Sequence, residues 1–110
     1  MEFKFVKIAV YVPGSHADIV RKALAESGCG HIGDYDCCSF TVKGIGRFRA
    51  LDGAKPFIGE VGKMEEVPED RIETICPLEK LDVVLQALKE AHPYDEPAVD
   101  IYPLLNGRQI

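Results

Sequence analysis

The chain contains one pattern twice, and this repeat limits its fold more than any other feature. Residues 8–13 form an apolar run that ends at Pro13, and residues 72–77 form a second run that ends at Pro77. A single offset aligns both runs and the segments that follow them. It pairs Asp18 with Asp82, Val20 with Val84, Ala23 with Ala87, Leu24 with Leu88 and Glu26 with Glu90. Each copy therefore predicts a strand followed by an amphipathic helix.

A further extended segment follows each predicted helix and completes the fold prediction. Residues 37–42 and 99–103 alternate apolar and polar side chains, which is typical of strands with one wet face. Two successive strand–helix–strand units predict an α+β fold. It is a ferredoxin-like βαββαβ sandwich, in which an antiparallel sheet carries two helices on one face. With 110 residues, the chain supports one core, so we expect a single domain over residues 1–110.

Residues 43–64 interrupt this order with a glycine-rich segment that also carries many apolar side chains. We expect a long hairpin excursion, because the segment is too apolar for a solvated linker. Gly44 and Gly46 favour a bulged hairpin over a phosphate-binding loop, since no helix start follows them. One small core could not cover all of these apolar side chains, so we expect a homo-oligomer.

Composition excludes several classes of partner. The net charge of −5 disfavours nucleic acid, whose phosphates are also negative. No apolar stretch has the length of a membrane span, and the N-terminal residues alternate charged and apolar side chains, unlike a signal peptide. The four cysteines contain no C-x-x-C pair, which indicates reduced, structural thiols. We expect a cytoplasmic protein that binds neither nucleic acid nor membrane.

Reactive side chains gather in the two loops that follow the predicted helices. Residues 30–35 supply His31, Asp34 and Tyr35, and residues 92–97 supply His92, Tyr94, Asp95 and Glu96. We expect the first and third strands to run parallel, which would place both helix exits at one end of the sheet. The two loops would then share one rim, and the segment 43–64 would extend from the opposite end.

That rim is open to more than one interpretation. It predicts a small-ligand site, and two imidazoles, His31 and His92, would suit a divalent metal ion such as zinc or copper. In the alternative, His92 interacts with the negative end of its own helix and His31 bonds a backbone carbonyl, so that both loops are structural.

Catalysis finds little support in the sequence. No nucleophile is paired with a base, and acidic pairs such as Glu69-Asp70 are typical of solvent-facing charge. Arg47, Arg49 and Lys55 could attract an anion, although such residues more often form a solvated rim. We therefore favour a protein without enzymatic activity.

Six short segments, in this order, resemble one known module. They are GHIGDY at 30–35, CSF at 38–40, GIGRF at 44–48, PFIGEVG at 56–62, EAHPYDEP at 90–97 and DIYPL at 100–104. The module is the domain inserted in the middle of many bacterial proteins of the Nif-three-like family, also called YqfO-like or dinuclear metal centre proteins. The family often has Glu where Asp95 stands.

The resemblance implies a fold similar to that of CutA and PII-type proteins, which are ferredoxin-like trimers. PII relatives bind small effectors near the loop between the second and third strands, and CutA relatives are linked to divalent metals. The dinuclear metal ligands of the Nif-three-like family lie in two flanking lobes, which this chain does not contain, so the resemblance assigns no catalytic residue.

The resemblance therefore implies a free-standing regulatory or ligand-sensing module that is non-catalytic and homotrimeric. A CutA-like divalent-metal-binding protein and a protein–protein assembly module are the alternatives. The candidate ligand-binding residues are His31, Asp34, Tyr35, Glu60, His92, Tyr94 and Glu96. Glu60 would reach the site across a subunit boundary, and His31 and His92 are the candidate metal ligands.

Overall fold

The structure is a computed structural model that describes residues 3–105. The strands are β1 (Phe5–Pro13), β2 (Phe40–Arg49), β3 (Met64–Pro77) and β4 (Val99–Leu104). The helices are α1 (Ala17–Ser27) and α2 (Leu81–Ala91), each entered through a short 3-10 turn, η1 (Gly14–His16) and η2 (Leu78–Lys80). The predicted βαββαβ order is confirmed. The ends of the predicted single domain, residues 1–2 and 106–110, lie outside the described part of the chain.

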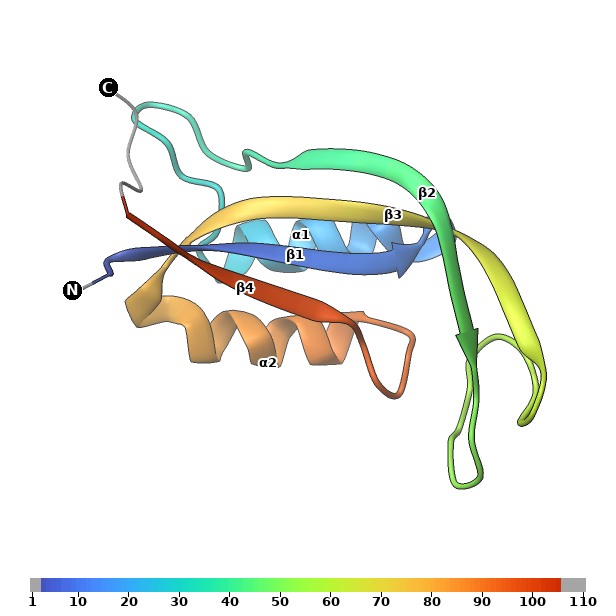
Figure 1. Cartoon of the computed structure of the whole chain (residues 1–110). Helices are drawn as coiled ribbons and strands as arrows, with labels where there is room; N and C mark the ends of the chain where they lie inside the picture. The colour runs from blue at the N-terminus through green and yellow to red at the C-terminus, as the bar shows by residue number, and fades with distance from the viewer. Residues whose placement is uncertain (1–2, 106–110) are drawn as a thin grey trace.

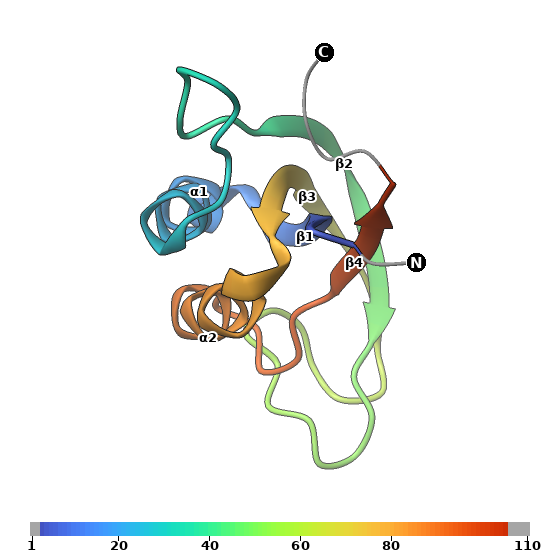
Figure 2. The ribbon, with the colours of Figure 1, turned by 90° about the vertical axis from the view of Figure 1, so that its left-hand side faces the viewer.

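The four strands form one antiparallel sheet in the order β2-β3-β1-β4. Both helices cover the same face of this sheet and leave the other face open (Figures 1 and 2). In the described residues, neither helix is long and apolar enough to cross a membrane.

Alternation along the central strand explains which face the helices cover. Val6, Ile8, Val10 and Val12 of β1 are buried and point toward the helices. Ile72 and Cys76 of β3 lie beside Val10 and Val6 on the same face. The helices supply the opposing layer with side chains spaced four residues apart, Val20 and Leu24 from α1 and Val84 and Leu88 from α2. Each such buried side chain contributes about 1.5–3 kcal/mol relative to an exposed one.

The expected direction of the third strand is wrong. β3 pairs antiparallel with β1, with Val10 opposite Ile72. The right-handed crossover through α1 makes β2 parallel to β1, and the hairpin then reverses the chain before β3 begins. The helices consequently run in opposite directions, and the loop after α1 and the loop after α2 lie at opposite ends of the sheet (Figure 1).

The glycine-rich segment is partly strand. Its hairpin lies at the end of the sheet opposite the loop after α1, as expected, but beside the loop after α2 rather than opposite it (Figure 1). β2 continues through Arg49, and its pairing with β3 runs from Phe40–Glu73 to Arg49–Met64. β1 stops pairing at Pro13, opposite Glu69, so residues 64–68 of β3 pair with β2 alone. This two-stranded extension bends across the end of the sheet toward the loop after α2 (Figure 1).

Two of the four cysteines are buried, as expected for structural thiols. Cys29 and Cys76 are buried in the core, and burial raises the pKa of both thiols. Cys37 is exposed and has a positive φ of 56°. None of the four forms a disulfide bond within the described residues.

Candidate functional site

A hollow of about 490 Å³ lies between the bent hairpin and the loop after α2. We call it the Tyr94 hollow. Its lining includes Gly46, Phe48, Pro56, Phe57, Ile58, Tyr94, Asp95 and Glu96, together with Tyr11 and Glu69 from the sheet. Three of the segments that carried the family resemblance, 44–48, 56–62 and 90–97, therefore meet at one place. Its volume is within the range of small-molecule sites.

Tyr94 and Glu69 form the polar centre of the hollow. The Tyr94 hydroxyl donates a hydrogen bond of 2.7 Å to Glu69 Oε2. Partial burial, and then the neighbouring carboxylate, raise the pKa of Tyr94. Both effects disfavour the phenolate, so Tyr94 acts here as a hydrogen-bond donor.

Aromatic rings form the walls around Tyr94. The ring centroids of Phe48 and Phe57 lie 6.2 and 6.4 Å from that of Tyr94, in tilted arrangements. His16 packs edge-on against Phe57 at 5.3 Å. Such tilted and edge-on pairs are favourable arrangements for aromatic rings. The hollow therefore combines apolar walls with one half-buried polar pair.

Gly46 makes room for the Glu69 side chain. A Cβ atom at position 46 would lie 1.8 Å from Glu69 Oε1, a distance that no side chain could tolerate without moving the carboxylate. Gly44, two residues earlier, has open space where its Cβ would be. The position of the Glu69 carboxylate thus requires glycine at residue 46, whereas no close contact requires glycine at residue 44.

His92 fixes the loop that carries Tyr94. Its Nε2–H donates to the Tyr11 carbonyl at 2.7 Å, and its Nδ1 accepts from the Tyr94 backbone N–H at 3.1 Å. The residue is buried, and burial lowers its pKa, so the neutral ring is favoured. With both ring nitrogens in hydrogen bonds to the backbone, His92 joins the loop to β1.

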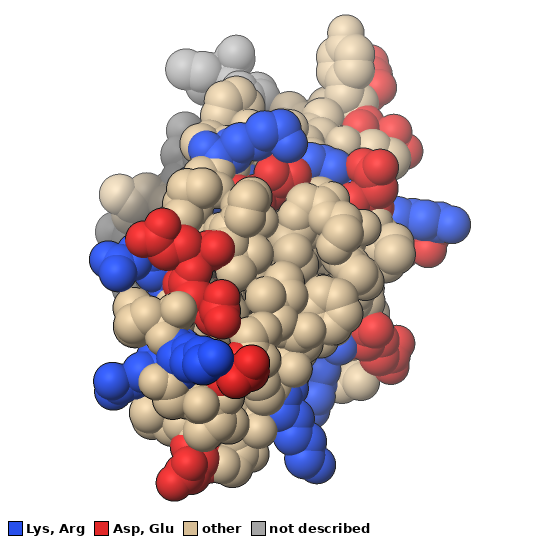
Figure 3. All heavy atoms as spheres, turned by 90° about the vertical axis from the view of Figure 1, so that its right-hand side faces the viewer, with Lys and Arg blue, Asp and Glu red and all other residues tan. Residues whose placement is uncertain are grey.

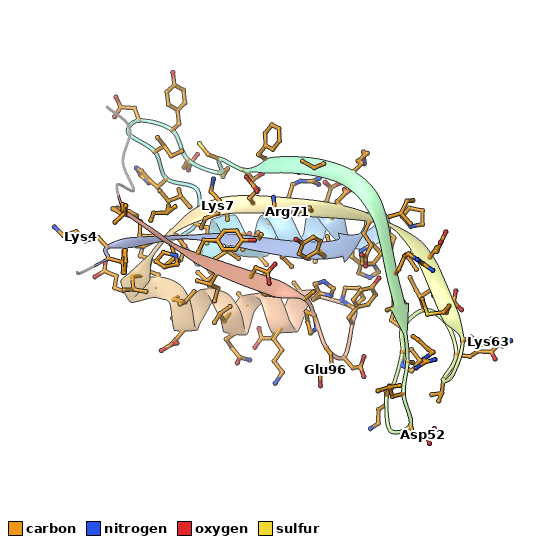
Figure 4. The ribbon with its side chains drawn as sticks, in the orientation of Figure 1. Lys4, Lys7, Asp52, Lys63, Arg71 and Glu96 are labelled. Atoms are coloured by element: carbon orange, nitrogen blue, oxygen red, sulfur yellow. The ribbon has the colours of Figure 1, made fainter. Side chains whose placement is uncertain are left out.

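The remaining acidic residues of this loop lie at the edge of the hollow. Asp95 Oδ2 accepts the Lys55 backbone N–H at 3.0 Å and so ties the loop to the hairpin. Glu96 is exposed and projects from the loop at the hairpin end of the molecule (Figure 4). Figure 3 shows this end of the molecule as a broad uncharged area with acidic and basic side chains around it.

The predicted site residues fall into two groups, because the two loops do not share a rim. His92, Tyr94 and Glu96 belong to the Tyr94 hollow or its loop, whereas His31, Asp34 and Tyr35 lie on exposed positions at the other end. His31 Nε2 bonds the Gly33 carbonyl at 3.0 Å, as the structural alternative expects. Glu60 pairs with Lys63 at 3.2 Å within the hairpin turn.

The structure does not bring His31 and His92 together. His31 borders a separate hollow of about 470 Å³, shared with Asp36 and Lys80. No group of three or more His, Cys, Asp or Glu side chains with metal-binding geometry occurs in residues 3–105. Joint coordination of one ion by the two histidines is therefore not supported by their positions.

Sequence reasoning missed Glu69 and the aromatic walls. The Glu69-Asp70 pair is not solvent-facing charge: Glu69 is half-buried and Asp70 is 4% exposed. The available signal was the alternation of β3, where residue 69 falls opposite Gly44 and beside Gly46. A glycine opposite the acid and a second one two residues further along the same strand leave space for the Glu69 side chain across the strands.

Comparisons with known proteins agree with this architecture. No protein-family model matches the chain. Its sequence is 53% identical over 98 residues to a GTP cyclohydrolase 1 type 2 homolog of Bacillus subtilis and 50% identical over 99 residues to one of Mycobacterium tuberculosis. These matches cover 89% and 90% of the chain but only 26% of each relative.

Solved structures show the same fold. A Bacillus cereus protein related to NIF3 superposes with a TM-score of 0.82 at 44% identity, covering 94% of the chain and 26% of that protein. CutA of Archaeoglobus fulgidus, a periplasmic divalent cation tolerance protein, superposes with a TM-score of 0.68 at 20% identity, covering 94% of the chain and 86% of CutA. The second likeness shows the fold alone. The chain therefore corresponds to the domain-sized, CutA-like segment of the NIF3-related proteins named GTP cyclohydrolase 1 type 2 homologs.

Proposed function

We propose that this chain is a non-catalytic regulatory module that binds a small molecule in the Tyr94 hollow. The observation that carries the proposal is the meeting of three distant segments, 44–48, 56–62 and 90–97, around one hollow with a single polar pair at its centre. Apolar walls and a few oriented polar groups are the usual composition of a ligand site.

The position of the hollow suits a sensor. Its floor belongs to the sheet, through Tyr11 and Glu69, whereas one wall is the hairpin extension that pairs only with itself beyond Glu69. A ligand that contacts both would change the position or order of the hairpin relative to the sheet. Binding would thereby be transmitted to any surface that the hairpin contacts.

The proposed module acts as a homo-oligomer, with a trimer as the expected form. Phe40 and Val42 on the open face are 65% and 47% exposed, and Ile45, Leu51 and Met64 of the hairpin region are also exposed. A second copy of this chain would bury these exposed apolar side chains in an interface. The same surfaces support the assembly-module alternative, in which oligomerisation alone is the function.

Divalent-metal binding stays a prediction for each histidine separately. His31 is exposed and would have to exchange the Gly33 carbonyl for a metal ion. His92 would have to lose a hydrogen bond that holds the Tyr94 loop. The CutA likeness supports the fold only, and about three-quarters of the length of the relatives named GTP cyclohydrolase 1 type 2 homolog has no counterpart in this chain.

Protein-observed NMR with a library of small metabolites tests the proposal. We expect shifts from at least one compound to cluster at Phe48, Phe57 and Tyr94, and Phe57→Ala to weaken that binding. Phe40→Ala is the matched control, because it removes an exposed ring of β2 that does not line the hollow. Shifts confined to residues 30–35, or equal binding by both variants, would contradict the assignment.

A further inference from the structure

We propose that the Tyr94 hollow binds an organic cation, an alkyl guanidinium or ammonium compound, and that the Glu69 carboxylate is its counter-ion. The inference rests on the proposed function, because it names the ligand class of the same hollow. Four features support it: the unused carboxylate oxygen of Glu69, the balance of charge around the hollow, the aromatic walls, and the second hollow that shares Glu69.

One oxygen of Glu69 is available to a ligand. Oε2 accepts the Tyr94 hydroxyl, whereas Oε1 has no hydrogen-bond partner, and Glu69 has no ion-pair partner, among residues 3–105. No fully buried side-chain oxygen or nitrogen in that part of the chain lacks a partner, so Oε1 is not fully enclosed, and Glu69 lines the hollow. A carboxylate accepts several hydrogen bonds, so Tyr94 does not exhaust its capacity.

Charge around the hollow is acidic in balance. Glu69, Asp95 and Glu96 contribute three carboxylates to the lining, against the guanidinium groups of Arg47 and Arg49. Arg47 is already paired with Glu66 at 3.2 Å. An anionic ligand would meet the uncompensated carboxylate of Glu69 at the centre of the hollow, which would be unfavourable in a partly desolvated site.

The walls also favour a cation. Three aromatic rings line the hollow, with the ring centroids of Phe48 and Phe57 within 6.4 Å of that of Tyr94. The negative faces of such rings attract guanidinium and ammonium groups, most strongly where water is excluded. The methylene chain of an alkyl cation would pack against the apolar side chains of the hairpin, including Leu51 and Ile58.

A second hollow gives the cation a defined direction. It measures about 280 Å³, is lined by Val42, Gly44 and Arg71 among others, and shares Tyr11, Gly46 and Glu69 with the first. Arg71 there is occupied by Tyr11 and Glu73. Because Arg71 blocks a second cation on that side, the ligand's charged end would reach Glu69 from the hairpin side. A planar guanidinium has the geometry to bind the carboxylate through two N–H groups.

Titration with agmatine, an alkyl guanidinium with an ammonium at its other end, tests the inference by calorimetry and protein-observed NMR. We expect saturable binding at low salt, with shifts at Phe48, Phe57 and Tyr94. Glu69→Gln keeps the size of the side chain and removes its charge, so affinity should fall by about 10- to 100-fold. Glu79→Gln removes the same charge from an exposed position on η2, at the other end of the molecule, and should bind like the parent chain.

Two results would overturn the inference. Equal agmatine binding by Glu69→Gln and the parent chain would show that Glu69 is not the counter-ion. Binding of an anion such as adenosine monophosphate in the hollow, without agmatine binding, would reject the cation while leaving the ligand-binding function intact. If neither these probes nor the metabolite library shift the hollow, both proposals fail. Circular dichroism of each variant confirms that a loss of binding is not a loss of fold.

Discussion

At the scale of single residues, the site depends on side chains whose roles are set by neighbours distant in sequence. His92 was a candidate metal ligand in the sequence, and its spacing gave no sign that β1 would supply a carbonyl to one of its nitrogens. Glu69 belongs to an acidic pair that was interpreted as solvent-facing charge. Local residue types identified the loop after α2 as important, but the partners come from Tyr11 and the hairpin, which only the folded chain brings near.

His92 should make the stability of the fold depend on pH. Its folded-state pKa is lowered from 6.5, chiefly by burial, so the unfolded chain binds a proton more readily. The contribution of His92 to the free energy of unfolding should therefore be complete above about pH 6.5. It should decline as the pH falls from there toward the lower folded-state pKa. Urea unfolding at pH 7.5 and 5.5 measures the difference.

The control for this pH effect is a histidine substitution at the other end of the molecule. His92→Gln should reduce the decline between the two pH values and lower stability at pH 7.5 by about 1–3 kcal/mol, because buried hydrogen-bond partners lose their match. His31→Gln changes an exposed ring and should leave the decline in place. The same decline in His92→Gln as in the parent chain would assign the pH effect to other groups.

Gly46→Ala should disturb the polar centre of the hollow without unfolding the chain. The new Cβ would displace the end of the flexible Glu69 side chain, so the cost in stability should be below about 1 kcal/mol. Separation of Glu69 from Tyr94 should lower the pKa of the Tyr94 phenol toward its ordinary value. Ultraviolet titration of the tyrosines measures this shift.

Gly44→Ala is the matched control, since open space surrounds the position where its Cβ would be. It should leave the titration of Tyr94 unchanged. A Gly46→Ala variant whose tyrosine titration equals that of the parent chain would show that Glu69 has another position available without breaking the pair.

At the scale of elements, the sequence predicted which segments are strands and helices, but not all of their directions. The repeat located both strand–helix units, and the alternation of apolar and polar residues indicated the strand that follows each helix. The direction of β3 was wrong because the pattern of a strand is the same in both directions. The hairpin between β2 and β3 decides it. A hairpin over residues 43–64, which was predicted, makes β3 antiparallel to β2 and therefore to β1, and the expectation of parallel strands overlooked this reversal.

Asp70 connects three elements, and its replacement should weaken the attachment of α1 to the sheet. The carboxylate is 4% exposed and lies 3.4 Å from Arg21 of α1 and 3.2 Å from Lys43 of β2. Asp70→Ala should lower the free energy of unfolding by about 1–3 kcal/mol, because two cations lose their partner in a partly desolvated position. Chemical unfolding followed by circular dichroism gives the value.

A comparison with Asp18→Ala separates this effect from general loss of charge. Asp18 also pairs with Arg21, at 2.8 Å, but it is fully exposed. Its removal should change stability by no more than about 0.5 kcal/mol. Equal effects of the two substitutions would mean that burial of Asp70 has no energetic weight.

At the scale of the whole molecule, the open sheet face and the hairpin expose large apolar side chains that lie outside the small core. Phe40 and Val42 of the edge strand β2 are exposed and lie opposite Glu73 and Arg71 of β3. Glu73 pairs with both Lys7 and Arg71, and Figure 4 shows these two basic residues near the middle of the sheet. The sequence predicted an oligomer from the apolar content of residues 43–64. It could not predict that part of this surface would turn inward to line the Tyr94 hollow.

Light scattering should show association that depends on concentration, with a trimer as the expected end point. Phe40→Glu with Val42→Glu introduces repulsion on the open face and should yield a monomer with an unchanged circular dichroism spectrum. Lys22→Glu on the exposed surface of α1 is the control and should leave the mass unchanged. A monomeric parent chain at every concentration would refute the oligomer.

The pairing of β1 with β4 has a mechanical consequence. The two strands are antiparallel, and Phe5 at the start of β1 lies opposite Leu104 at the end of β4. A force applied at these two points would open the pair one rung at a time, because each hydrogen bond carries the load only after its neighbour has broken. The two strands should therefore separate at low force, beginning at this end. The hairpin and the Tyr94 hollow lie at the far end of the strands, so the force should reach them last.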